Sequence, residues 1–361
     1  MPARVLIVSA SIGEGHDLPA RILAQALEDR GAHAPIVDGL AEAGRVANRL
    51  AGAATSYDTR LGNLAFDAGH RLVSEWRLTR GASAYAVHVL GRRGLQAAVE
   101  RAQPDVVVST YPGATESLGR LRSAGALEMP VVSAITDLAS LRYWAHPGVD
   151  LHLLTHPESE AEVRAVAGPI TRIVTVHGLT RAAFRTPPVP STARTRLGLP
   201  GEGSMVVVSG GGWAVGDLEG AVTAALGAEA GIVIALCARR DDVRARLSAR
   251  FAAHPPVQVW GFTERMPEVL AAADVLVHST AGLTVLEAMA SGCRTISYGW
   301  GYGHIRSNNR AYERFGLAEV APSRQALEAA LRRLLRAPRA EPYQPELPQA
   351  ADLILELAQA A

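Results

Sequence analysis

Residues 274–292 read DVLVHSTAGLTVLEAMASG, an apolar run followed by small residues and then by a helical pattern. The run at 274–279 is typical of a strand that is buried on both faces of a parallel sheet. Small residues between a strand and a helix leave backbone amides free, and such amides bind phosphate oxygens. Glu287 lies one to two turns into the helix, where its carboxylate could accept hydrogen bonds from ribose hydroxyls.

Two further strand ends are rich in glycine. The run at 205–209 leads into Gly210-Gly211-Gly212-Trp213, and the run at 4–9 leads shortly into Gly13-Glu14-Gly15-His16. Asp17 and Pro19 are expected to open the helix that follows this second stretch. Glycine allows a ligand to approach the backbone closely, because it has no side chain. A tight turn without a ligand is the alternative for either stretch alone. Two such turns in tandem favour ligand binding.

Short β-branched runs alternate with helical stretches along most of the chain. The expected strands form two series, 4–9, 34–38, 105–109, 130–136, 150–155 and 170–176, then 205–209, 231–237, 257–260, 274–279, 294–297 and 317–320. Alternation of this kind predicts a parallel, doubly wound α/β sheet with helices on both faces. We therefore expect two Rossmann-like domains in tandem.

Proline marks the expected domain boundary. Residues 186–192 read TPPVPST, which cannot continue a helix or a central strand. The N-terminal domain is therefore expected to span 1–186 and the C-terminal domain 187–343. The last segment, 344–361, contains an apolar helical face, and we expect this helix to return to the N-terminal domain.

Composition excludes several classes of protein. The chain has 361 residues, and its 36 basic and 35 acidic residues leave a net charge of +1, so nothing selects nucleic acid as a partner. All the basic residues are arginines, which excludes a Walker P-loop and pyridoxal phosphate or Schiff-base chemistry, since these need lysine. The only cysteines, Cys237 and Cys293, are far apart in the sequence, which fits a reducing cytoplasm. No apolar run is long enough to span a membrane.

Residues 40–103 contain no convincing strand, so we expect a long helical segment within the first domain. Between 45 and 101 there are nine arginines and four acidic residues, a net charge of +5, with apolar residues interleaved. Such a segment can dock on anionic lipid. A solvated helical face is the alternative that composition alone favours.

His16 is the residue of the first glycine-rich turn that could act as a base. An imidazole titrates near neutrality and can take a proton from a hydroxyl group. A structural or merely exposed histidine is the alternative. Metal chemistry has no support, because His152 and His156 flank an expected strand at a spacing too long to share an ion, and no Asp-x-Asp occurs.

Asp38 raises the possibility of a dinucleotide site, because it ends the second expected strand, where a ribose-binding acid would lie. The stretch Gly13-Glu14-Gly15-His16-Asp17-Leu18, however, lacks the third glycine of the GxGxxG fingerprint. A second glycine-rich domain also argues against a dehydrogenase.

Taken together, these motifs resemble those of GT-B glycosyltransferases. The narrower resemblance is to the family of monogalactosyldiacylglycerol synthase, processive diacylglycerol glucosyltransferases and the lipid II-forming N-acetylglucosaminyltransferase, and it covers most of the chain. The stretches that carry it are Gly13-Glu14-Gly15-His16, Thr136-Asp137-Leu138, 144–150, 279–287, Gly303-His304 and Asn308-Asn309.

The resemblance implies two Rossmann-like domains that face a cleft, with a UDP-sugar bound by the C-terminal one. Uracil would lie near Phe262, the diphosphate at the two C-terminal turns, the ribose on Glu287, and the sugar or diphosphate near His304 and Asn308. The implied donor-binding residues are Gly210, Gly211, Gly212, Phe262, Met266, Thr280, Ala281, Gly282, Thr284, Glu287, His304 and Asn308.

The resemblance also assigns the acceptor side of the reaction. His16 would be the catalytic base or a group beside it, Asp137 a second catalytic candidate that orients the site, and Gly13 and Gly15 acceptor-binding residues. Retaining enzymes of the sucrose-synthase-like group carry a glutamate eight residues before the ribose glutamate, where this chain has Ser279. Inversion is therefore implied. The stretch 303–309 lacks the glutamine that many relatives use near the sugar, so the donor sugar stays open.

We therefore expect an inverting, metal-independent and cofactor-free glycosyltransferase. It would move a hexosyl or N-acetylhexosaminyl group from a UDP-sugar to the hydroxyl of a lipid or small-molecule acceptor. The expected location is the cytoplasm, with peripheral contact at the inner face of the cell membrane if the basic segment meets anionic lipid. The alternatives are a UDP-sugar 2-epimerase-like enzyme, an NAD-dependent dehydrogenase and a non-catalytic nucleotide-sugar-binding partner.

Overall fold

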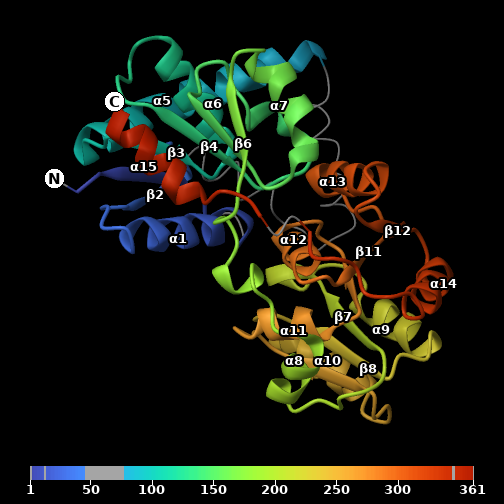
Figure 1. Cartoon of the computed structure of the whole chain (residues 1–361). Coiled ribbons are helices and arrows are strands. Elements are labelled where there is room, and N and C mark those ends of the chain that lie inside the picture. Colours follow the sequence, from blue (N-terminus) through green and yellow to red (C-terminus); the bar gives the residue numbers. More distant parts are fainter. Residues whose placement is uncertain (1, 12–13, 45–76, 344–345, 361) are drawn as a thin grey trace. The chain divides into compact units, whose positions relative to one another are not determined.

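The computed structural model describes residues 2–11, 14–44, 77–343 and 346–360. The chain divides into two compact units. Unit 1 comprises Met1–Thr180, Tyr302–His304 and Glu346–Ala361, and unit 2 comprises Arg181–Gly301 and Ile305–Pro345. Each unit contains one six-stranded parallel sheet. Helices flank both sheets (Figure 1). The prediction of two Rossmann-like α/β domains is confirmed.

The sheet of unit 1 has the strand order β2-β1-β3-β4-β5-β6. Its strands are β1 (Val5–Ser9), β2 (Ile36–Asp38), β3 (Val106–Ser109), β4 (Val131–Ile135), β5 (Leu151–Leu154) and β6 (Arg172–Thr175). Each coincides with an expected strand and is shorter by a residue or two at its ends. Side chains alternate between the two faces of a strand, so the apolar runs are buried on both sides.

Helices cover both faces of this sheet. They are α1 (Glu14–Glu28), α2 (Gly39–Glu42), α5 (Arg77–Ala102), α6 (Pro112–Ser123), α7 (Glu160–Ala167) and α15 (Ala350–Ala360), with short 3₁₀ turns at Leu141–Tyr143 and Pro157–Ser159. Val5 and Ile7 pack with α1 and α15. Leu6 and Val8 pack with α5 and α6. The expected helical segment is present as α2 and α5, and residues 45–76 of it lie outside the described residues.

The C-terminal helix α15 belongs to unit 1 (red in Figure 1). Arg30, two residues after the end of α1, forms an ion pair with Asp352, with Nε and Oδ1 2.6 Å apart. The backbone of His177 bonds to Pro348 and to Ala350 at 2.9 and 2.8 Å. These contacts hold the last helix on the face that α1 covers.

The start of α1 differs from the sequence-based expectation. Asp17 and Pro19 were expected to open this helix, but it already includes Glu14. The carboxylate of Asp17 is engaged elsewhere, because it accepts a hydrogen bond of 2.6 Å from the hydroxyl of Ser9 at the end of β1. The side chain therefore ties the helix to the strand.

The sheet of unit 2 has the order β12-β11-β10-β7-β8-β9. Its strands are β7 (Met205–Ser209), β8 (Ile232–Leu236), β9 (Val257–Trp260), β10 (Val275–His278), β11 (Arg294–Tyr298) and β12 (Glu319–Ala321). Helices of unit 2 are α8 (Pro190–Leu197), α9 (Leu218–Gly227), α10 (Asp241–Arg250), α11 (Met266–Ala272), α12 (Leu283–Ala290), α14 (Arg324–Leu334) and, from its third residue, α13 (Gly303–Arg314). Alternate strand residues again supply two cores, one towards α9 and α14 and one towards α8 and α11.

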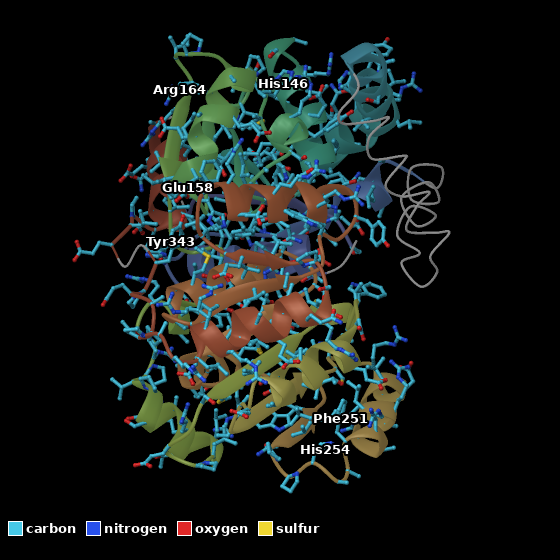
Figure 2. The ribbon with its side chains drawn as sticks, turned by 90° about the vertical axis from the view of Figure 1, so that its right-hand side faces the viewer. His146, Glu158, Arg164, Phe251, His254 and Tyr343 are labelled. Carbon is cyan, nitrogen blue, oxygen red and sulfur yellow. The ribbon has the colours of Figure 1, made fainter. Side chains whose placement is uncertain are left out.

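Beyond the sheet, ring contacts close the loop after α10. Phe251 follows α10 directly, and its ring meets that of His254 edge-on, with centroids 5.8 Å apart. The two side chains lie together in Figure 2.

No helix among the described residues is long and apolar enough to cross a bilayer.

Each sheet has a point where the strand order reverses. In unit 2, β7 and β10 are neighbours, with Ser209 beside His278 at their carboxyl ends. In unit 1, β1 and β3 are neighbours, with Val8 beside Ser109. Ligands of open α/β sheets bind in the crevice beyond the carboxyl ends of strands at such a reversal. Of the expected site residues, His16 follows β1, Gly210–Gly212 follow β7 and Thr280–Gly282 follow β10, the strands at these two reversals.

Candidate active site

His16 lies in the first turns of α1, at the strand reversal of unit 1. Its Nδ1 is 3.1 Å from the carbonyl oxygen of Thr110, which follows β3. A carbonyl can only accept a hydrogen bond, so Nδ1 carries the proton of the neutral ring. Nε2 then carries the lone pair of the ring. This tautomer gives His16 the form that a general base requires.

Two aromatic rings hold the imidazole of His16 in place. Tyr111 meets it edge-on with centroids 5.3 Å apart, and Trp144 lies at 5.7 Å with a tilted ring. Burial lowers the pKa of His16 below its ordinary value of 6.5, and the charge of nearby Asp137 partly offsets that effect. The ring is therefore neutral, and able to accept a proton, at pH 7.

Asp137 follows β4 and is connected to His16 through Trp144. The indole Nε1 of Trp144 donates a hydrogen bond of 2.9 Å to Oδ2 of Asp137. Since Nδ1 of His16 faces Thr110, the carboxylate acts on the imidazole through its field rather than by a hydrogen bond to that nitrogen. The negative charge of Asp137 favours the protonated imidazole.

The two acceptor-side glycines differ in what can be described. Gly13 lies outside the described residues. Gly15 is exposed, and an added Cβ would meet no atom within 4 Å. The space beside Gly15 is therefore open to a ligand.

The glycines after β7 pack against the turn after β10. Gly211 has a φ of +66°, and an added Cβ would lie 3.2 Å from the side chain of Thr280. At Gly210, an added Cβ would lie 2.4 Å from backbone atoms of Val215. The backbone geometry thus requires glycine at both positions. Gly212 lies in the short 3₁₀ turn that follows.

The turn after β10 leads directly into α12. Gly282 is the N-cap of this helix and provides no side-chain cap, and Ala281 has a left-handed φ of +49°. An added Cβ at Gly282 would meet no atom within 4 Å. The amide of Val285 already donates to the carbonyl of Gly282 at 2.9 Å. The earlier amides of the helix start, those of Leu283 and of partly exposed Thr284, are available to an anion.

Glu287 is buried on α12, with only 4% of its surface exposed. Its Oε1 has no hydrogen-bond partner among the described residues. Burial raises the pKa of Glu287 from 4.5 to about 7, although the charge of Arg181 opposes the shift. An unpartnered buried carboxyl oxygen is costly, so its presence indicates a group that binds there.

The charge of Arg181 acts on the carboxyl of Glu287, and this effect was not anticipated from the sequence. One of its terminal nitrogens donates to the carbonyl of Glu264 at 2.8 Å. Its Nε is buried without a partner among the described residues. No motif marks Arg181, because it is one of 36 arginines in the chain.

The remaining expected donor residues have different surroundings. Phe262 is 55% exposed, with the guanidinium of Arg239 over its ring at 4.2 Å. Met266 begins α11 and packs against the core, and Asn308 is buried on α13. His304 groups with unit 1, where its charge contributes to the lowered pKa of His16.

Thr110 and Tyr111 contact His16 but were not singled out by the sequence. The sequence feature that could have indicated them is their position directly after the apolar run 105–109, which forms β3, the neighbour of β1. Strand adjacency could not be known from the sequence, so the contact could not be predicted.

Asp38, the residue that raised the dinucleotide alternative, caps a helix. Its Oδ1 accepts hydrogen bonds from the amides of Leu40 and Ala41 at 2.8 and 3.2 Å. This is the usual role of aspartate at an N-cap, and it occupies the carboxylate that a ribose would need. Among the described residues, no cluster of three or more His, Cys, Asp or Glu side chains could hold a metal ion.

Models of known protein families match each unit. The family described as monogalactosyldiacylglycerol (MGDG) synthase matches residues 55–179, within unit 1. The family described as glycosyl transferases group 1 matches residues 221–337.

Individual relatives share these descriptions. Monogalactosyldiacylglycerol synthase 1 of Arabidopsis thaliana is 32% identical over 222 residues, which is 57% of this chain and 41% of the relative. A processive diacylglycerol beta-glucosyltransferase of Bacillus thuringiensis is 23% identical over 320 residues, 88% of this chain and 81% of the relative. The aligned part thus spans less than half the length of the plant relative and most of the bacterial one.

Solved structures with the same architecture extend over the whole chain. MurG of Acinetobacter baumannii matches with a TM-score of 0.59 at 16% identity, covering 100% of both chains. Arabidopsis thaliana UGT89C1, complexed with quercetin, matches with a TM-score of 0.57 at 13% identity, covering 99% of this chain and 94% of the other. At these identities the likeness shows a shared two-domain fold.

Proposed function

The chain belongs to the GT-B glycosyltransferases, and from that premise we propose that it is an inverting, metal-independent enzyme that uses a UDP-sugar. It transfers a hexosyl or N-acetylhexosaminyl group to the hydroxyl of an acceptor, which we propose is a lipid. The names of the plant and Bacillus relatives, both of which refer to diacylglycerol, support the lipid acceptor.

The unpartnered Oε1 of Glu287 is the observation that carries the donor assignment. A ribose presents two adjacent hydroxyls, and both can donate to a carboxylate. Binding would supply the partner that Oε1 of Glu287 lacks. It would also favour the ionised form of the carboxyl, whose pKa burial raises to about 7.

The diphosphate is assigned to the strand reversal beside Glu287. The turn after β7 lies against Thr280, and the uncapped first turn of α12 begins at Gly282. Helix N-terminal amides stabilise negative charge without a cation. Arg181 adds a guanidinium near Glu287 in the same unit. These groups support departure of UDP without a divalent ion.

His16 is proposed to act as the base on the acceptor. Nε2 takes the proton of the acceptor hydroxyl as its oxygen forms a bond to the anomeric carbon of the sugar. The bond between that carbon and the diphosphate oxygen breaks in the same displacement, so UDP leaves with the electron pair and the anomeric configuration is inverted. Loss of the hydroxyl proton balances the new glycosidic bond, and the imidazolium beside Asp137 releases that proton afterwards.

An apolar and basic face on α5 supports a membrane-bound acceptor. Tyr85, Val89 and Leu90 are 61, 40 and 43% exposed. Arg92 and Arg93 are exposed on the next turn. Exposed aromatic and aliphatic side chains beside arginines are typical of helices that lie on anionic membranes.

Vesicle co-sedimentation tests this membrane contact. We expect salt-sensitive binding to phosphatidylglycerol vesicles and weaker binding to phosphatidylcholine vesicles. The double variant Arg92→Glu/Arg93→Glu should lose the preference for anionic vesicles, whereas Arg244→Glu/Arg246→Glu on α10 should retain it. Equal sedimentation of the unaltered chain with both vesicle types would contradict membrane docking.

Release of UDP tests the enzymatic proposal. The purified chain is incubated in excess EDTA with UDP-glucose, UDP-galactose or UDP-N-acetylglucosamine, with and without diacylglycerol vesicles. We expect UDP release that depends on one sugar and on the acceptor. Release of UDP without a requirement for any acceptor, or interconversion of the donors, would instead indicate the epimerase-like alternative, and activity lost in EDTA would contradict metal independence.

A further inference from the structure

His278 ends β10 at the strand reversal of unit 2, between Ser209 on β7 and Ser297 on β11. Only 1% of its surface is exposed. Burial lowers its pKa from 6.5 to about 3, so the ring is neutral at physiological pH. A buried neutral imidazole has one donor nitrogen and one acceptor nitrogen, and each needs a partner.

The acceptor nitrogen of His278 is used within the turn that follows. The amide of Ala281 donates to Nδ1 of His278 at 3.3 Å. Nδ1 therefore carries the lone pair and Nε2 carries the proton, and this Nε2 is buried without a partner among the described residues. The structure thus fixes the tautomer of the ring.

Ala281 has a backbone conformation that an alanine rarely adopts. Its φ is +49°, in the left-handed region, at a cost of about 1–2 kcal/mol for a residue with a Cβ. Its amide donates to His278, and α12 begins two residues later, after Gly282. The hydrogen bond to the imidazole offsets the cost of this conformation.

We propose that His278 is a positioning residue of the donor site, which aims the first-turn amides of α12 at a diphosphate by holding Ala281 in its left-handed conformation. The inference rests on the proposed function, because it concerns the site assigned to UDP. It adds a residue that neither touches the nucleotide nor belongs to the implied donor set. Thr280 precedes Ala281, and its side chain lies against Gly211, so restraint of Ala281 also restrains the turn after β7.

Paired substitutions separate the acceptor nitrogen from the bulk of the ring. His278→Phe keeps a buried ring but removes the acceptor, whereas the side-chain oxygen of His278→Asn can occupy the position of Nδ1. Val277→Ala is the control, since Val277 lies in the same strand and packs into the opposite core. The readouts are the dissociation constant for UDP, by calorimetry, and amide hydrogen exchange at Ala281 without ligand.

We expect His278→Phe to weaken UDP binding about tenfold, as the loss of one hydrogen bond predicts. His278→Asn should bind UDP nearly as the unaltered chain does, and so should Val277→Ala despite its lower stability. Exchange at Ala281 should be slow in the unaltered chain and in His278→Asn, and fast in His278→Phe.

Unchanged UDP affinity in His278→Phe would overturn the proposal and leave the histidine a purely structural role. Equal impairment of His278→Asn and His278→Phe would overturn it too, because the acceptor atom would then be irrelevant. If the unaltered chain binds no UDP, the proposed donor is wrong. Hydrogen exchange then decides alone, and equal protection of Ala281 in all variants would refute its restraint by His278.

Discussion

The turn after β1 in unit 1 and the turn after β10 in unit 2 occupy similar places at the strand reversals of their sheets, but their polar groups are satisfied differently. His16 is bonded through Nδ1 to Thr110 and flanked by two aromatic rings. Asp137 is bonded to Trp144. Around α12, by contrast, Oε1 of Glu287 and Nε of Arg181 are buried without partners among the described residues.

The difference indicates what each site is prepared to do. A base must be held in one tautomer before the substrate arrives, so its neighbours bond to it in the free protein. A binding pocket instead keeps polar groups that only the ligand can satisfy, at a cost to the free protein. Thr110, whose carbonyl bonds to the base, is an exception in unit 1, because its buried hydroxyl has no partner among the described residues.

Removal of His16 should have the largest effect, because His16 is the base that the free protein holds in one tautomer. We expect His16→Ala to lower kcat about 10²- to 10⁴-fold, the usual contribution of a general base. His16→Asn is the matched variant, since its amide can still donate to Thr110 but cannot take a proton. Both should bind UDP with unaltered affinity. Acceptor-dependent transfer at a normal rate in either variant would remove His16 from the chemistry.

Changes at Glu287 test the unsatisfied site. We expect Glu287→Gln to weaken UDP binding about ten- to hundredfold, because hydrogen bonds to a charged group contribute about 1.5–3 kcal/mol. The ligand control is 2′-deoxy-UDP, which lacks one of the two ribose hydroxyls. Calorimetry should show a large difference between UDP and 2′-deoxy-UDP for the unaltered chain and a small one for the variant. The same difference in both proteins would assign Glu287 another partner.

The pH dependence of stability follows from the same carboxyl group. Its pKa is raised from 4.5 to about 7 in the folded protein, so the folded state binds more protons than the unfolded state between these values. The contribution of Glu287 to the free energy of unfolding is therefore largest below pH 4.5. It falls by about 3 kcal/mol as the pH rises to 7.

Denaturant unfolding of the ligand-free protein at several pH values measures this loss. Glu287→Gln carries no titrating group at this position, so its free energy of unfolding should fall less between pH 5 and 8. Parallel curves for the two proteins would contradict the burial of an unpartnered carboxyl.

Alanine substitutions at three glycines give the smallest and most graded effects. Gly210→Ala should destabilise most, by about 1–3 kcal/mol, because its Cβ would clash with the backbone of Val215. Gly211→Ala should cost about 1 kcal/mol for its positive φ. Gly282→Ala should cost little stability, about 0.5 kcal/mol, because its Cβ meets nothing and alanine is only a poorer N-cap, yet it should weaken UDP binding. Full UDP affinity in Gly282→Ala would mean that the ligand does not approach this turn.

Sequence patterns predicted most of the fold because buried parallel strands need continuous apolar runs. Each expected strand is present, and its ends shift by only a residue or two. The helix start at Asp17 was wrong because a carboxylate before a helix predicts a cap, whereas this one bonds to Ser9. A partner eight residues earlier in the chain lies outside the pattern by which a helix cap is predicted.

The site was predictable only where it follows a strand end. His16, Gly211 and Glu287 stand in local patterns, and the structure places them at or beside the strand reversals. Thr110 takes its role from its contact with His16, and Arg181 from the effect of its charge on Glu287 of α12. Those contacts depend on strand order, which the sequence does not encode locally.

Nucleotide selectivity tests the central claim most directly. Melting temperatures are measured in EDTA with UDP, three UDP-sugars, a GDP-sugar, NAD and NADP, for the unaltered chain and for Glu287→Gln. A ligand at about 100 times its dissociation constant adds roughly 2.7 kcal/mol of stability. We predict stabilisation by UDP and UDP-sugars that Glu287→Gln largely abolishes. Stabilisation by NAD or NADP alone, unaffected by that substitution, would contradict the account and make the chain a dinucleotide-binding protein.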